Sequence, residues 1–178
     1  MAIIPRPYQL QAEQKIRDAY VAGHRAVMLT SPVASGKTVT LSRISAGVYQ
    51  KRKRVLVLAH RRELIYQISD TLKTIGVPHG TILGGQPGVP RSHVVVAAVQ
   101  TAHKRLRHLA TPDLIIADEA HRAVEDSAFG QIMSHFSNAR VLGVSASPQR
   151  TDKRPLSGIF DTLVHGPSVA ELIALGYL

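Results

Sequence analysis

The sequence predicts a doubly wound α/β domain built on a mostly parallel sheet. The chain has 178 residues, the size of one domain, and 44% of them are hydrophobic. Five short apolar runs, rich in β-branched residues, are continuous rather than alternating, as expected of strands covered on both faces. Segments of helical length separate them, which is typical of a parallel sheet with crossover helices. The expected strands are residues 26–30, 55–59, 94–98, 114–117 and 141–144.

The clearest helix is expected from about residue 62 to residue 75, where apolar residues recur at helical spacing. The Gly- and Pro-rich residues 84–90 predict a surface loop. No internal repeat is visible, so we expect a single domain over residues 1–178. The residues that form the apolar side of the expected helix are Leu64, Ile65, Ile68, Leu72 and Ile75.

The composition excludes several kinds of site. The chain has no Cys, which excludes disulfides and thiolate metal sites. No signal peptide is recognisable and no apolar stretch approaches the roughly 18 residues of a membrane span. We therefore expect a cytoplasmic protein with no membrane partner.

The charge balance favours a polyanionic partner. The 22 Lys and Arg residues outnumber 12 Asp and Glu residues, for a formal net charge of +10. Nucleic acid, an anionic membrane and phosphorylated ligands all fit this excess. The Lys-Arg-Lys-Arg run at residues 51–54 precedes an expected strand, at the amino end of the sheet, and we interpret it as a solvated charge run.

Polar residues follow all five expected strands, at the edge where ligands of such sheets bind. His60 and Arg61 follow the second run, and Gln100 and Thr101 follow the third. These four residues are candidate nucleic-acid contacts, and contacts of this type to phosphates are independent of sequence and sensitive to salt. Aromatic residues make up only 4% of the chain and Trp is absent, so base stacking is not expected to dominate.

Residues 31–38, called the phosphate loop below, lie between a strand and a helix and end in Gly36-Lys37-Thr38. Backbone N–H groups at such a helix start can face phosphates, with Lys37 on the β- and γ-phosphates and Thr38 on Mg²⁺. The strict pattern fails because Ser31 stands where the first Gly should be. The alternative is an ordinary helix start with a solvated Lys.

Asp118 and Glu119 follow a buried strand. Two adjacent carboxylates are costly there unless a positive charge lies nearby, and a Mg²⁺–nucleotide complex supplies one. Asp118 would orient Mg²⁺, partly through water, and Glu119 would position the attacking water as a general base. The alternative is a solvated pair that caps the next helix.

The order of these motifs carries a family resemblance. Residues 118–121 read Asp-Glu-Ala-His, a DEAH box; the phosphate loop precedes it, and Ser-Ala-Ser at 145–147 follows it. In this order they resemble the first RecA-like domain of superfamily 2 helicases, closest to the branch that contains type III restriction subunits and RadD-like repair helicases. Residues 6–9 look like that branch's adenine-reading element, and residues 57–64 and 98–101 look like its nucleic-acid motifs.

The resemblance implies a three-layer RecA-like P-loop NTPase domain of an ATP-dependent DNA helicase or translocase, with ATP and Mg²⁺ as cofactors. Its partners would be DNA, single-stranded or branched, and a second RecA-like domain that this chain lacks. We therefore expect the chain to be part of a longer protein, with weak or no ATPase activity and no unwinding alone.

The resemblance also implies roles for single residues. Arg6 and Gln9 would contact the nucleotide base, because one Gln amide matches the N6/N7 edge of adenine. His121 would hydrogen-bond Ser145 or Ser147 and connect the nucleotide to the nucleic acid. The other residues implied are Ser35, Gly36, Lys37 and Thr38 for ATP, and Lys37, Asp118 and Glu119 for catalysis.

Two motifs depart from the family pattern. The family's phosphate loop usually has Thr and Gly where this chain has Val33 and Ala34. If that Gly position needs a positive φ, Ala costs about 1 kcal/mol or more, and ATP binding would weaken. Ser147 replaces the usual Thr and keeps its hydroxyl, so little effect is expected.

Two other functions stay open at this point. A regulatory module that binds nucleotide or DNA without hydrolysing ATP would explain the altered phosphate loop. A small P-loop kinase would need a phosphate-acceptor site and lid arginines, which the DEAH box and Ser-Ala-Ser do not favour. The sequence does not separate DNA from RNA, and the preference for DNA rests on the resemblance.

Overall fold

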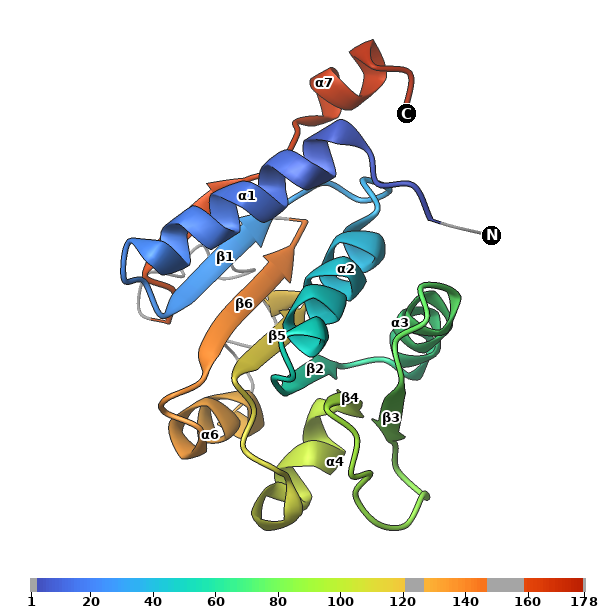
Figure 1. The fold of residues 1–178 in the computed structure, drawn as a ribbon, viewed down its shortest axis with the longest axis vertical. Coiled ribbons are helices and arrows are strands. Elements are labelled where there is room, and N and C mark those ends of the chain that lie inside the picture. Colours follow the sequence, from blue (N-terminus) through green and yellow to red (C-terminus); the bar gives the residue numbers. More distant parts are fainter. Residues whose placement is uncertain (1–2, 121–126, 147–158, 178) are drawn as a thin grey trace.

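The computed structural model describes residues 3–120, 127–146 and 159–177. Within these residues, strands form one seven-stranded sheet in the order β3-β4-β2-β5-β6-β1-β7, and every pairing is parallel (Figure 1). The strands are β1 (Ala26–Thr30), β2 (Val55–Ala59), β3 (His79–Ile82), β4 (Val94–Ala98), β5 (Leu114–Asp118), β6 (Arg140–Ser145) and β7 (Thr162–His165).

Helices cover both faces of this sheet, which makes the three layers that the sequence predicts. Each interior strand divides its side chains between two apolar clusters, so Val27 and Leu29 of β1 face one cluster while Ala26 and Met28 face the other. The first cluster packs against α1, α2 and α3, and the second against α4 and α6. The helices are α1 (Pro7–Val21), α2 (Lys37–Gln50), α3 (Arg62–Thr74), α4 (Val99–Lys104), α6 (Ser127–His135) and α7 (Val169–Ala174), with a 3₁₀ helix at Leu106–His108.

The five expected strands are all confirmed, and the helix expected at 62–75 is α3. Two strands, β3 and β7, were missed. Both lie at the edges of the sheet, where one side of the strand has no partner strand to cover it. Only Ile82 is buried in β3 and only Val164 in β7, so neither segment shows the continuous apolar run of an interior strand.

The carboxylate of Asp161 joins the start of β7 to the start of β1. One of its oxygens, Oδ2, accepts hydrogen bonds from the backbone N–H groups of Arg25 and Ala26, both at 2.7 Å. These bonds favour the charged carboxylate and therefore lower the pKa of the Asp161 carboxyl. The hydrogen bond from the N–H of Ala26 has the larger effect, and the one from Arg25 adds to it. Asp161 therefore helps to seat the last strand beside the strand that leads into the phosphate loop.

Across the described part of the chain, every helix is too short or too polar to cross a lipid bilayer.

Asp161→Ala is expected to lower the free energy of unfolding by about 1 kcal/mol near neutral pH, a modest figure because the side chain is exposed. The pKa of Asp161 is lower in the folded state than its usual value of 3.8. The stabilisation is therefore present at pH values above 3.8, and it is lost as the pH falls through the folded-state pKa. Urea denaturation at several pH values measures it. This account would be contradicted if Asp161→Ala were still less stable than wild type in strong acid. It would also be contradicted if Asp70→Ala lowered the free energy of unfolding by the same amount.

Candidate functional site

The parallel register brings the phosphate loop and the two carboxylates to the same edge of the sheet. Strand β6 lies between β1 and β5, so that Leu29, Val144 and Asp118 stand side by side. Two strand spacings separate β1 from β5, which is about 10 Å. The backbone N–H of Ser31 also donates to the carbonyl of Ser145 at 2.9 Å, which ties the start of the loop to the end of β6.

Hydrogen bonds close the phosphate loop on itself. The hydroxyl of Ser31 donates to Ser35 Oγ at 2.6 Å, and the Ser35 hydroxyl donates to the carbonyl of Pro32 at 2.7 Å. The ammonium of Lys37 donates to the carbonyls of Ser31 and Pro32, each at 3.2 Å. The positive charge of Lys37 is therefore held over the loop, where an anion bound to the loop would meet it.

The loop uses two residues with left-handed backbone. Gly36, which precedes α2, has φ of +78°, and Ala34 has φ of +67°. Glycine adopts this region freely, whereas an alanine Cβ crowds the following carbonyl. The condition stated from the sequence, that position 34 needs a positive φ, is met in the structure, and Ala34 carries the strain.

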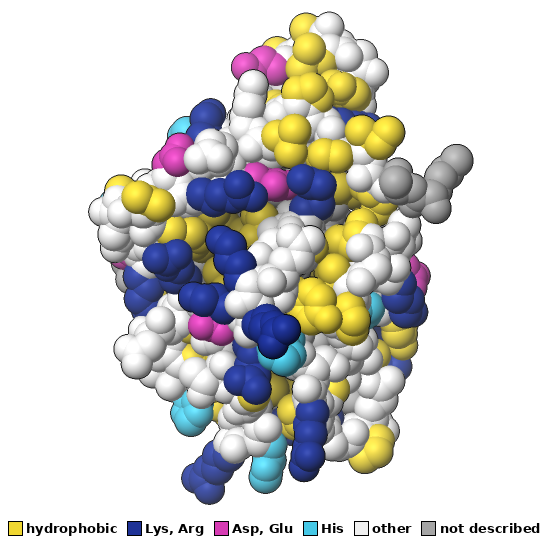
Figure 2. Space-filling model, in the orientation of Figure 1, with side chains coloured by type: hydrophobic (Ala, Val, Ile, Leu, Met, Phe, Trp, Pro, Cys, Tyr) yellow, Lys and Arg dark blue, Asp and Glu magenta, His cyan; other side chains and the backbone are white. Residues whose placement is uncertain are grey.

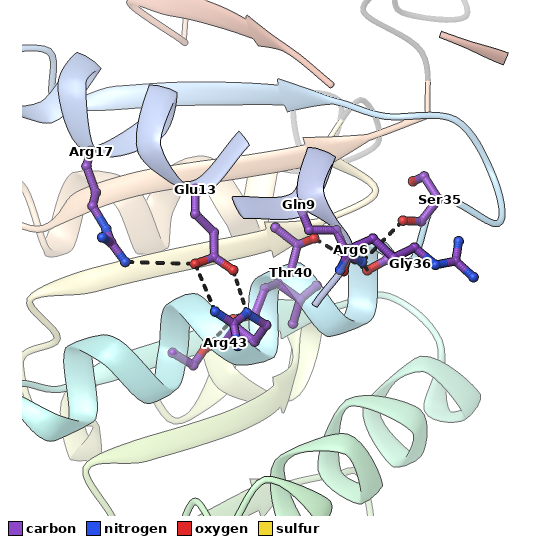
Figure 3. Close-up of polar contacts among 10 residues, drawn as sticks. Arg6, Gln9, Glu13, Arg17, Ser35, Gly36, Thr40 and Arg43 are labelled. Atoms are coloured by element: carbon purple, nitrogen blue, oxygen red, sulfur yellow. Dashed lines mark hydrogen bonds and ion pairs between the residues drawn. The ribbon is translucent and has the colours of Figure 1, made fainter. Parts of the chain in front are cut away.

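Helix α1 holds the phosphate loop through Gln9 and Tyr8 (Figure 3). The Gln9 side chain, only 3% exposed, donates from Nε2 to the carbonyls of Ser35 at 3.3 Å and Gly36 at 3.2 Å. Its Oε1 accepts from the backbone N–H of Arg6 at 2.8 Å, and the Tyr8 hydroxyl donates to the Ser35 carbonyl at 2.9 Å. The Gln9 amide thus fixes the loop backbone, while its predicted contact with adenine stays a prediction.

Arg6 and Tyr8 also contact the other end of the described chain. The guanidinium of Arg6 lies 4.3 Å from the centre of the Tyr177 ring, and its Nη1 donates to the Tyr8 hydroxyl at 2.9 Å. The rings of Tyr8 and Tyr177 meet edge to face at 5.5 Å. The sequence analysis did not give Tyr177 a place in the site, because nothing in the local pattern indicates a contact over such a separation.

A buried carboxylate joins α1 to α2 (Figure 3). Glu13 is 5% exposed, and its two oxygens accept from Arg43 Nε at 2.7 Å and Nη2 at 3.5 Å. The exposed Arg17 lies 3.8 Å from the same carboxylate. Because α2 begins at Lys37, this ion pair sets the position of the helix that follows the phosphate loop. The sequence analysis missed it, since one Glu and one Arg on helices show no local signal.

Asp118 and Glu119 differ in their placement. Asp118, 5% exposed, is the last residue of β5, and its Oδ1 accepts from the backbone N–H of Glu119 at 3.0 Å. Glu119 has φ of +52°, a conformation that costs a non-glycine residue about 1–2 kcal/mol. This turn ends the strand.

The loops that follow β2, β3 and β4 meet near the predicted nucleic-acid contacts. His60 follows β2, the exposed Arg61 precedes α3, and Gln100 and Thr101 form the first turn of α4. Gly84, just after β3, lies between the loops that follow β2 and β4. Its carbonyl accepts a hydrogen bond from Arg62 Nη2 at 2.7 Å. On its other side, a Cβ at Gly84 would lie 3.9 Å from Thr101 Oγ1. The contact between Arg62 and Gly84 was missed because β3 was missed.

Two predicted coupling residues, His121 and Ser147, lie outside the described residues. The third, Ser145, is fully buried at the end of β6.

Ala34→Gly is expected to raise the free energy of unfolding by about 0.5–1 kcal/mol, because it removes left-handed strain at an exposed position. Chemical denaturation measures the change. Ala22→Gly is the matched control, because Ala22 is exposed with a right-handed φ of −68°, where Gly should destabilise. A loss of stability in Ala34→Gly would contradict the assignment of strain.

Arg43→Ala should destabilise the fold by about 3 kcal/mol, because Glu13 would be left buried without its main partner. Arg17→Ala removes a guanidinium from the same carboxylate at an exposed position, and should cost less than about 1 kcal/mol. Thermal and urea unfolding of the two variants give the comparison. Equal losses of stability in the two variants would show that the Glu13–Arg43 ion pair contributes no more than a surface contact.

Known proteins with this fold include nucleic-acid motors. The Pyrococcus furiosus Hef helicase domain superposes with a TM-score of 0.76 at 25% identity, over 90% of this chain and 37% of that one. The Type ISP restriction-modification enzyme LlaGI, in complex with a DNA substrate mimic, gives 0.76 at 16% identity, over 98% and 21%. The UvsW helicase of bacteriophage T4 gives 0.69 at 21% identity, over 92% and 60%.

Proteins related in sequence also include a helicase and a restriction enzyme subunit. The EcoAI endonuclease subunit, a type I restriction enzyme of Escherichia coli, is 33% identical over 98% of this chain. The putative ATP-dependent helicase IRC3 of Saccharomyces cerevisiae is 32% identical over 97% of it. The chain spans 23% of the length of the first relative and 27% of the second.

The family described as "Type III restriction enzyme, res subunit" matches residues 2–150, which include the phosphate loop, the DEAH box and both predicted nucleic-acid segments. Together with the all-parallel sheet and its helicase neighbours, this match means that the chain belongs to the type III restriction res-subunit family and has the fold of the N-terminal RecA-like domain of superfamily 2 helicases.

Proposed function

We propose that this chain binds ATP with Mg²⁺ and hydrolyses it as one half of a DNA helicase or translocase. The observation that carries the proposal is the register that places Asp118 two strands from the phosphate loop, at the same edge of one sheet. The loop offers an ammonium and the first turn of a helix, and β5 offers a buried carboxylate at its end. A triphosphate with a divalent cation matches that combination of charges.

The side chains that surround this position have separate tasks. Lys37 would bind the β- and γ-phosphate oxygens, and its ammonium already lies over the loop. Thr38 and Asp118 would hold Mg²⁺, which supplies neutralising charge to the phosphates when bound. Mg²⁺ usually keeps several waters and is bound through one or two carboxylates together with substrate phosphates. Glu119 would accept a proton from the attacking water.

The base of the nucleotide would lie beside Arg6 and Gln9. Arg6 is stacked on Tyr177, so its planar guanidinium is held in one orientation next to the loop. Gln9 lies against Gly36, where even a Cβ would come within 2.5 Å of Nε2. Both residues therefore stand at the phosphate loop in fixed positions, which supports a role in placing the base.

Nucleic acid would cross the sheet edge near Arg61, Gln100 and Thr101. The exposure of Arg61 and Gln100 and the contact between the three loops support this, as do relatives whose structures contain DNA. A second RecA-like domain would complete the motor, because the chain spans about a quarter of the relatives it matches. Opening and closing of the two halves would convert hydrolysis into movement.

The second candidate is a regulatory module that binds nucleotide without hydrolysing it. The left-handed Ala34 favours it, because strain in the phosphate loop weakens the loop as a binding element. Ala34→Gly tests this support: if strain limits binding, the affinity for ATP rises, and unchanged affinity removes the support.

Lys37→Ala should weaken binding of a fluorescent ATP analogue by this chain at least tenfold, because a charge-assisted contact is lost. Glu119→Gln should leave that affinity within about twofold, yet lower hydrolysis by about a hundredfold or more once a second RecA-like domain is joined to the chain. Lys51→Ala, remote from the phosphate loop, is the control. An inert two-domain protein that still binds ATP would favour the regulatory module.

A further inference from the structure

A basic hollow lies at the opposite end of the sheet from the nucleotide site. Its volume is about 770 Å³, and its lining includes three arginines and a histidine: Arg54, Arg91, Arg105 and His108. This hollow is called the basic pocket below. From the sequence, Arg54 was interpreted as part of a solvated charge run, whereas Arg105 and His108 were expected at the ligand edge of the sheet, following Gln100 and Thr101. The structure places Arg105 and His108 beside Arg54 instead, and Arg91 had no assigned role.

The strand register assembles this pocket. Arg54 directly precedes β2, and Arg91 stands shortly before β4. Because Val55 and Val94 are register partners in adjacent parallel strands, the segments leading into both strands arrive side by side. The arginines thus converge from different parts of the chain, which local sequence could not show.

Arg105 builds the wall of the pocket. Its guanidinium donates to the carbonyl of Gly88 at 2.7 Å and to that of Gln86, in the loop between β3 and β4. That anchoring holds the loop, including Pro90, against the pocket while the charge of Arg105 stays within it. Arg54 and Arg91 remain exposed and complete the basic lining.

Among residues 3–120, 127–146 and 159–177, no carboxylate neutralises the charge of the pocket. No acidic side chain lines it, and none of its three guanidiniums forms an ion pair with a described carboxylate. Asp113, which lies near Arg54, instead accepts from the backbone N–H of Arg54 at 2.8 Å and pairs with Lys53 at 3.9 Å. Like charges gathered without a counter-charge repel one another, and a bound anion relieves that repulsion.

The size and lining of the pocket favour a polyanionic chain over a single small anion. The volume lies in the range of about 300–1,000 Å³ that drug-sized ligands occupy, and far exceeds what one phosphate group fills. Apolar surface from Pro90 and Ala110 lies between the cations, as suits a sugar-phosphate backbone. Figure 2 shows Lys, Arg and His side chains at the lower end of the molecule, where Figure 1 places α4.

Helix α4 connects the basic pocket to the nucleic-acid edge. Gln100 and Thr101 lie in its first turn, and Arg105 immediately follows its last residue. The helix has six residues, so about 9 Å along its axis separates the two regions. A nucleic-acid strand bound at the sheet edge could therefore continue along α4 to the basic pocket.

We propose that the basic pocket binds the phosphodiester backbone of a nucleic-acid strand, as a second contact region at the amino end of the sheet. The inference extends the nucleic-acid binding proposed above, and it needs neither ATP nor hydrolysis. Binding here is independent of base sequence and falls with added salt, because only phosphates are contacted.

Charge-matched double variants test the proposal in the full 178-residue chain. Arg54→Gln with Arg91→Gln should lower the affinity for a fluorescent single-stranded oligonucleotide at least fivefold, and reduce the slope of log affinity against log salt by about 1.4. Lys51→Gln with Arg52→Gln removes the same charge from exposed residues outside the pocket, and should change the affinity less than twofold. Equal losses in the two double variants would overturn the proposal.

Thiol protection gives a second readout that leaves the charges intact, because the chain has no Cys. Oligonucleotide should slow maleimide labelling of the thiol introduced by Ala110→Cys, in the pocket. It should not slow labelling in Ala22→Cys, an exposed position next to α1. Unchanged labelling of Ala110→Cys in the presence of saturating oligonucleotide would overturn the inference.

Arg61→Ala separates this inference from the proposed function. If Arg61→Ala weakens binding while the pocket variant binds as wild type does, the sheet edge is the contact and the pocket proposal fails alone. If only the pocket variant weakens binding, the pocket proposal stands and the expected role of Arg61 falls. No measurable binding of oligonucleotide by the wild-type chain would overturn both.

Discussion

Parallel pairing of every strand is the constraint on which the rest of this structure depends. It places the carboxyl ends of all strands at one edge of the sheet and the amino ends at the other. Residues that are distant in the sequence are therefore brought together by the strand pairing, without direct contacts between them. Strand β6 between β1 and β5 sets the distance from the phosphate loop to Asp118. The same pairing brings the starts of β2 and β4 together at the opposite end, where the basic pocket forms.

The phosphate loop depends on support from outside its own sequence. Of its two left-handed residues, Gly36 adopts this conformation freely, whereas Ala34 makes the shape of the loop costly. Gln9 and Tyr8 offset it with hydrogen bonds to the carbonyls of Ser35 and Gly36. Tyr177 packs on Arg6 and Tyr8 in turn, so the last described helix and the first helix act together on the loop (Figure 1).

Buried polar groups in this domain lie chiefly where the site is built. Glu13 is enclosed between α1 and α2, Gln9 faces the phosphate loop, and Asp118 ends β5. Burial of such groups is costly unless hydrogen bonds or charges satisfy them, and Arg43 and the loop carbonyls do so for the first two. The same groups that stabilise the contact between α1 and α2 therefore also hold the phosphate loop in place.

The sequence by itself determined the fold class, the five interior strands and the position of the phosphate loop, because continuous apolar runs and the Gly-Lys-Thr motif are local signals. It also showed that Ala34 stands where the family usually has Gly, while the left-handed backbone of that residue was decided by the structure. The edge strands β3 and β7, the contact of Arg6 with Tyr177 and the Glu13–Arg43 ion pair were decided only by the tertiary structure. Edge strands lack the double burial that marks an interior strand, and contacts between distant segments follow from packing, which no local pattern records.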